Sequence, residues 1–126
     1  MKKIIYTNKA PAVVGPYSQA VQCDKHIYVS GQIPVNPETG ELVNESIEAQ
    51  TRTVLNNIKA ILNEANATLE DVVKATIFVT DLKNYAKVNE VYGEYFKENA
   101  PARVCVEVSE LPREVDVEIE CVAILD

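Results

Sequence analysis

PARVCVEVSELPREVDVEIE, residues 101–120, is the stretch that decides the fold. Apolar and polar residues alternate through 103–108 and again through 115–120, and this period of two is typical of β-strands. Pro112 lies between the two runs and has no N–H to donate to a sheet, so we expect the chain to reverse there. The pattern therefore predicts a β-hairpin whose valines face a common core.

The opposite face of this hairpin carries charge. If the valines of both arms share one core, Arg103 lies across from Glu118 or Glu120. One interpretation is a solvated sheet surface with cross-strand ion pairs. The other is a site for a small carboxylate, because a lone arginine beside Cys105 is unusual on a solvated face and a planar guanidinium binds carboxylate at two points.

Length and charge narrow the class of protein. The chain has 126 residues, so we expect one domain spanning residues 1–126. Its formal net charge of −7 repels phosphate backbones and anionic lipids, so neither nucleic acid nor a membrane is an expected partner.

Cysteine and histidine usage points to the cytoplasm and away from a metal site. Cys23, Cys105 and Cys121 are odd in number and show no C-x-x-C spacing, which argues against a disulfide framework and fits a reducing cytoplasm. His26 is the only histidine, so we expect neither a multi-histidine metal site nor a Ser-His-Asp triad.

Outward from residues 101–120, strand-like and helix-like segments alternate. The expected elements are strands at 3–6, 18–22, 26–30 and 72–80, and helices at 47–65 and 82–96. The resulting order is βββαβαββ, an α+β arrangement in which both helices cover one face of a mixed sheet. No element remains to cover the other face, so we expect an oligomer.

Four blocks of the chain resemble the RidA (YjgF) family. They are Gly15–Ala20 (GPYSQA), Ser30–Pro34 (SGQIP), Pro101–Val108 (PARVCVEV) and Val117–Glu120 (VEIE), and the similarity extends over essentially the whole chain. The resemblance implies a chorismate-mutase-like fold assembled as a homotrimer, with pockets at the subunit interfaces. The segment Lys97–Ala100 is shorter than in many relatives, which leaves one wall of the pocket in doubt.

The family resemblance also implies an activity. Its members hydrolyse 2-imino acids, such as 2-iminobutanoate and 2-iminopropanoate, to 2-oxo acids and ammonia without a cofactor. Arg103 matches the arginine that binds the substrate carboxylate, and Glu118 matches the glutamate that orients the attacking water. An arginine and a carboxylate suit this chemistry because the imine carbon is already electrophilic.

The same resemblance assigns five further residues to the pocket: Tyr17, Ser30, Gly31, Asn89 and Cys105. Tyr17 matches a pocket wall, Ser30 and Gly31 line the pocket through side chain and backbone, and Asn89 has the weakest match. Cys105 is expected to act through its backbone amide, because a strand offers little to activate a thiol.

Other functions stay open from the sequence. A non-catalytic sensor of 2-oxo acids would use the same Arg103, although a sensor of anions gains nothing from Glu118. A chorismate mutase of similar architecture would need to bind two carboxylates, and only one arginine is matched. RNA cleavage has been attributed to the family, but the acidity of this chain opposes it. The sequence identifies neither the preferred imino-acid side chain nor the partner dehydratase.

Overall fold

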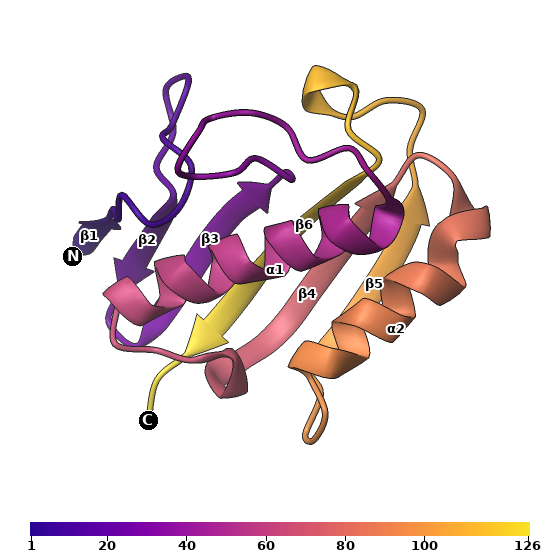
Figure 1. Cartoon of the computed structure of the whole chain (residues 1–126). Coiled ribbons are helices and arrows are strands. Elements are labelled where there is room, and N and C mark those ends of the chain that lie inside the picture. Colours follow the sequence, from indigo (N-terminus) through magenta and orange to yellow (C-terminus); the bar gives the residue numbers. More distant parts are fainter.

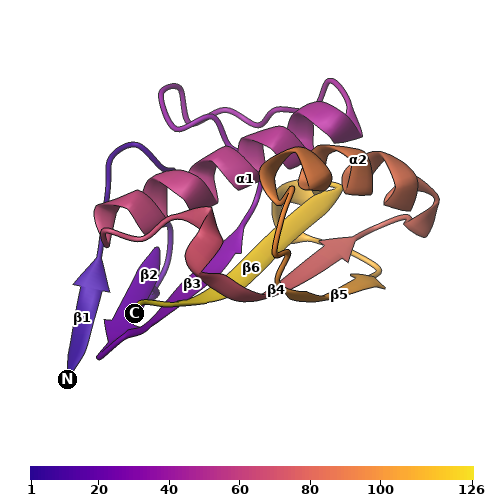
Figure 2. The same ribbon diagram turned by 90° about the horizontal axis from the view of Figure 1, so that it is seen from below.

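A six-stranded mixed sheet carries two α-helices on one of its faces (Figures 1 and 2). The computed structural model describes residues 1–126. The elements are β1 (Lys2–Ile5), β2 (Ala20–Cys23), β3 (His26–Gln32), α1 (Ile47–Glu64), β4 (Val72–Val79), α2 (Tyr85–Tyr95), β5 (Ala102–Glu107) and β6 (Val117–Ile124). The order βββαβαββ and the placement of both helices on one face confirm the predicted fold.

The strand order corrects the predicted hairpin. The strands follow each other as β1-β2-β3-β6-β4-β5, so β4 lies between the two arms that were expected to pair. β4 pairs with β5 in parallel and with β6 antiparallel. The hairpin prediction is wrong because α2 connects β4 to β5 as a crossover, which places β5 beside β4 and leaves only the far side of β4 for β6.

The faces of β5 are also reversed relative to the prediction. Arg103 lies beside the buried Ala75 of β4, and Cys105 lies beside the buried Ile77. These polar residues therefore face the helices, while Val104 and Val106 lie on the open face with 43% and 37% of their surface exposed. The alternation correctly predicted a strand. Which of its two faces turns toward the core depends on the neighbouring strand and helix, and the alternation does not contain that information.

α1 begins where the sequence predicts. The Ser46 side chain caps its first turn, with Oγ accepting a hydrogen bond from the backbone N of Ala49 at 3.0 Å. The buried stripe of α1 packs on the sheet and includes Val54, Ile58 and Leu62. None of the helices combines the length and apolar character needed to cross a membrane.

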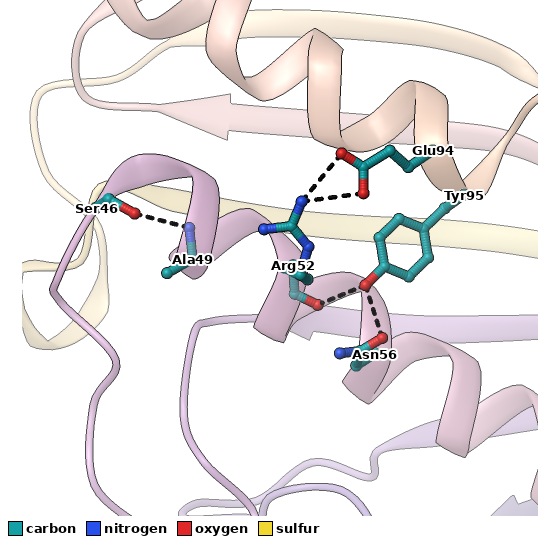
Figure 3. A network of polar contacts seen from close by, with 6 residues as sticks. All are labelled: Ser46, Ala49, Arg52, Asn56, Glu94 and Tyr95. Carbon is teal, nitrogen blue, oxygen red and sulfur yellow. Dashed lines mark hydrogen bonds and ion pairs between the residues drawn. The ribbon is translucent and has the colours of Figure 1, made fainter.

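A polar brace joins α1 to α2 on the outer surface (Figure 3). Nη2 of Arg52 donates to both carboxylate oxygens of Glu94 at 3.0 Å, and the Tyr95 hydroxyl donates to Oδ1 of Asn56 at 2.7 Å. Both members of the ion pair are exposed to solvent, which screens their attraction, so the pair adds little to the stability of the fold. The brace contributes to holding α2 over β5, where Arg103 lies.

Candidate functional site

Arg103 is held beneath α2 by two tyrosines. Its Cζ atom lies 4.8 Å from the ring centroid of Tyr92 and 5.6 Å from that of Tyr85, within cation–π range. Its Nη2 also donates to the Tyr85 hydroxyl at 2.9 Å. The single salt bridge of the structure joins Arg52 to Glu94, so the Arg103 guanidinium has no carboxylate partner. An oriented, unneutralised guanidinium is suited to bind the carboxylate of a ligand.

Two buried polar atoms of α2 lack hydrogen-bond partners, namely the hydroxyl of Tyr92 and Oδ1 of Asn89. Residues three apart lie on the same face of a helix, and Tyr92 is the residue that stacks on Arg103. Burial raises the pKa of Tyr92 to about 12, an effect that the charge of Arg103 partly offsets, so the hydroxyl stays protonated. Unsatisfied buried groups are uncommon, and these two are available to water or a ligand.

Cys105 lies two residues beyond Arg103 on the same face of β5. Its side chain is half-buried, and burial raises the pKa of the thiol while the charge of Arg103 lowers it to a smaller extent. A thiol with a raised pKa is protonated near neutral pH and is a poor nucleophile. The geometry therefore gives no support to covalent chemistry at Cys105.

Glu118 lies on the other face of the sheet. It is opposite Phe78 in the β4–β6 pairing and is half-buried. Burial raises the pKa of its carboxyl, and the charge of the neighbouring Glu120 raises it further. A carboxylate whose pKa is shifted toward neutrality accepts a proton from water more readily than an ordinary glutamate.

Gly31 leaves room for this carboxylate. A Cβ atom at position 31 would overlap Oε2 of Glu118 and lie 2.9 Å from its Cδ. Only glycine lets the backbone of β3 approach the carboxylate so closely. Gly31 and Tyr17, whose side chain is 52% exposed, also line one cavity.

Ser30 is engaged with the backbone. Its Oγ donates to the carbonyl of Ser18 at 2.6 Å, and its N–H donates to the carbonyl of Gln19 at 2.9 Å. Both groups hold the end of β3 against the segment that precedes β2. Ser30 therefore positions Gly31. Its hydroxyl proton is engaged with the Ser18 carbonyl, so the hydroxyl does not donate a hydrogen bond to a ligand.

The predicted site residues thus form two half-sites on opposite faces of the sheet. The arginine half-site, on the helix-covered face, contains Asn89, Arg103 and Cys105. The glutamate half-site contains Tyr17, Gly31 and Glu118. Within one chain, Arg103 and Glu118 are not brought together, contrary to the prediction that they share a face.

Sequence reasoning missed the two tyrosines that hold Arg103. Tyrosines at helical spacing, such as Tyr85 and Tyr92, are usually core residues, so their presence alone does not mark a site. The available signal was their spacing: Tyr85, Asn89 and Tyr92 recur at i, i+4 and i+7, which places a polar residue on the same face. The structure contains no group of three or more His, Cys, Asp or Glu side chains arranged to hold a metal ion.

The fold and these half-sites define a class of small α+β proteins with an exposed sheet face and an unpaired arginine beneath a helix. A family model described as "Endoribonuclease L-PSP" matches residues 7–125. The chain belongs to the RidA (YjgF) family.

Individual relatives match over nearly their whole length. A RutC family protein of Pyrococcus abyssi is 57% identical over 122 residues, covering 97% of this chain and 96% of the relative. The Escherichia coli protein named "Putative reactive intermediate deaminase TdcF" is 45% identical over 127 residues, covering 98% of each chain.

Solved structures share the fold closely. The crystal structure of TdcF with bound serine superimposes with a TM-score of 0.95 at 42% identity, covering 98% of this chain and 99% of TdcF. RidA from an Antarctic Psychrobacter species superimposes with a TM-score of 0.94 at 46% identity, with the same coverage of each chain.

Proposed function

We propose that this protein hydrolyses reactive 2-imino acids, such as 2-iminobutanoate and 2-iminopropanoate, to 2-oxo acids and ammonia. The observation that carries the proposal is Arg103, a guanidinium fixed by Tyr85 and Tyr92 with no carboxylate partner in the chain. Support also comes from TdcF, which is named as a deaminase of reactive intermediates and whose structure contains serine. Serine, like a 2-imino acid, carries a carboxylate beside a nitrogen-bearing carbon.

The complete site requires two copies of the chain. Because the arginine and glutamate half-sites lie on opposite faces, one small molecule cannot contact Arg103 and Glu118 of the same chain. The open face presents Val104 and Val106, both exposed, beside half-buried Phe78. Apolar surface of this kind is typically covered by a partner. We infer a homotrimer in which Arg103 of one subunit faces Glu118 of the next.

In this arrangement the substrate carboxylate binds the Arg103 guanidinium through two hydrogen bonds, which orients the imine carbon. Glu118 accepts a proton from water as the water oxygen bonds to that carbon and the C=N π electrons move to nitrogen. The resulting carbinolamine then loses its C–N bond. Because the substrate reacts as the protonated imine, this carbinolamine is neutral, and Glu118 returns its proton to the amine nitrogen before the C–N bond breaks. Ammonia leaves with the electron pair of that bond, and the hydroxyl proton passes to the freed Glu118 carboxylate as the C–O bond becomes the carbonyl of the 2-oxo acid.

The non-catalytic sensor of 2-oxo acids is the remaining alternative. The serine bound by TdcF is consistent with a sensor, because it shows that a relative holds a small carboxylate ligand. The half-buried Glu118 distinguishes the two functions. A sensor of anions is weakened by a second carboxylate in its site, whereas hydrolysis requires a base for water.

A coupled assay tests the proposal. A threonine dehydratase generates 2-iminobutanoate, semicarbazide traps the imine, and the rate of semicarbazone formation is followed with and without this protein. We expect the protein to divert imine to free 2-oxobutanoate, and Glu118→Gln to abolish the diversion. Binding of 2-oxobutanoate without any diversion would establish the sensor in place of the enzyme.

A further inference from the structure

A polar pocket of about 270 Å³ lies between α1, the loop that follows β3 and the segment that follows β1. We refer to it as the outer pocket. Its polar lining consists of Lys9, Asn36, Glu38, Thr53, Asn56 and Asn57. Pockets for drug-sized molecules typically occupy roughly 300–1,000 Å³ and are mostly apolar, so the outer pocket suits a smaller and more polar ligand.

Hydrogen bonds within the fold shape the loop wall of the outer pocket. Oδ1 of Asn36 accepts from the backbone N of Glu38 at 2.8 Å, and the backbone N of Asn36 donates to the carbonyl of Glu41 at 2.8 Å. Nδ2 of Asn57, on α1, donates to the carbonyl of Val35 at 2.9 Å and so ties the loop to the helix. The pocket is therefore formed before a ligand arrives, which lowers the cost of ordering it on binding.

Asn57 presents an unpaired acceptor to the outer pocket. The residue is only 2% exposed, and its bond to the Val35 carbonyl fixes which end of the amide carries the nitrogen, since a carbonyl only accepts. No group of the chain donates to the other end, Oδ1. The fully enclosed unpaired atoms are Oδ1 of Asn89 and the hydroxyl of Tyr92, so Oδ1 of Asn57 is reached from the pocket that this residue lines. Such an acceptor gains from a ligand that donates to it.

Unpaired charges of opposite sign lie on the same pocket. Neither Lys9 nor Glu38 forms an ion pair. Asn56 adds hydrogen-bond donors, because its Oδ1 accepts from the Tyr95 hydroxyl at 2.7 Å and its Nδ2 hydrogens remain free (Figure 3). The outer pocket therefore offers a cation with amide donors, and also an anion with an amide acceptor.

We propose that the outer pocket binds a free amino acid in its zwitterionic form, with a small polar side chain such as that of serine. Lys9 and Nδ2 of Asn56 bind the carboxylate. Glu38 and Oδ1 of Asn57 accept hydrogen bonds from the ammonium group. The net charge of −7 disfavours a simple anion, whereas a zwitterion carries no net charge. The lining has little apolar surface, so a large apolar side chain gains little there.

The outer pocket is separate from the proposed reaction site. Neither Arg103 nor Glu118 lines it, so the inference does not depend on the deaminase activity. The pocket is built on α1, on the face opposite the one where we infer that subunits meet, so it stays accessible in an oligomer. Serine carries a carboxylate that Arg103 could also bind, and variants must therefore assign any binding to one of the two places.

Isothermal titration calorimetry with serine tests the proposal, and Arg103→Gln removes the competing half-site. We expect Arg103→Gln to retain serine binding. In that background, Lys9→Gln and Glu38→Gln should each weaken binding by at least about tenfold, because each loses a charge-assisted contact. Lys59→Gln and Glu64→Gln are matched controls on exposed positions of α1 outside the pocket, and they should leave the affinity unchanged.

Matched ligands test the chemistry. Propionate lacks the ammonium group and ethanolamine lacks the carboxylate, so each should bind at least about tenfold more weakly than serine. Leucine should also bind more weakly. Equal affinity for propionate and serine would reduce the site to an anion contact at Lys9 and would overturn the proposal.

Nuclear magnetic resonance gives a second readout. Serine added to isotope-labelled Arg103→Gln should shift the side-chain amide signal of Asn57. The absence of both heat and this shift would overturn the proposal. Loss of serine binding in Arg103→Gln, together with unchanged binding in the single variant Lys9→Gln, would place serine in the arginine half-site and would also overturn it.

Discussion

Replacing Arg103 with lysine tests the proposed anchor for the substrate carboxylate. Lysine keeps the positive charge but loses the planar fork, and it cannot reproduce both the hydrogen bond to the Tyr85 hydroxyl and the two-point contact with a carboxylate. The substrate would still be attracted to the site. Its imine carbon would be poorly oriented toward the water at Glu118.

The expected magnitudes differ between activity and stability. Misorientation of this kind costs roughly a hundredfold in kcat/KM, equivalent to about 3 kcal/mol of transition-state stabilisation. Folding loses less, because Arg103 has no ion pair and contributes one hydrogen bond of about 1 kcal/mol together with the cation–π contacts, part of which lysine retains. We expect the melting temperature to fall by about 4 °C.

The assay is imine diversion by purified protein, with thermal unfolding and light scattering on the same sample. Arg52→Lys is the matched control, because Arg52 forms an exposed ion pair with Glu94 on the outer surface (Figure 3). The control should retain imine turnover. Wild-type turnover by Arg103→Lys, in a folded protein of unchanged oligomeric state, would refute the assignment of Arg103.

Four further predictions follow from the half-sites. Burial raises the folded-state pKa of Glu118 above its ordinary value of 4.5, so the folded protein holds this proton at pH values where the unfolded chain has lost it, and the free energy of unfolding falls as pH rises from 4.5 through the raised pKa. Glu118→Gln should abolish turnover, and in urea titrations it should stabilise the protein more at pH 7 than at pH 4. Equal pH profiles of stability for variant and wild type would contradict the burial argument. Gly31→Ala should lower kcat more than tenfold, since its Cβ displaces the Glu118 carboxylate, and an unchanged rate would show that the carboxylate position is unimportant. Tyr85→Phe keeps the ring but removes the hydrogen bond to Arg103, so KM for the imine should rise roughly fivefold to tenfold with little change in melting temperature; unchanged kinetics would limit the tyrosine to packing. Cys105→Ala should retain most activity in the coupled assay, and complete loss in a folded protein would reinstate a role for the thiol.

Several features were determined by local sequence alone. Alternation over residues 103–108 identified a strand, and Ser46 marked the start of α1, because side-chain period and capping depend only on near neighbours along the chain. The order βββαβαββ followed from the sequence of such segments. The local pattern also marked Arg103 as unusual, whereas Glu118 was distinguished from Glu120 only by the resemblance to the family.

Tertiary structure alone decided which residues meet. The alternation of β5 is equally compatible with either face turned inward, and only pairing with β4 beneath α2 directs Arg103 toward the helices and Val104 toward solvent. The same pairing separates Arg103 from Glu118 by the thickness of the sheet. Strand partners are determined by long-range packing and by the crossover through α2, and a period-two pattern carries no information about either. The sequence could therefore name the two charged residues, but it could not show that they belong to separate half-sites.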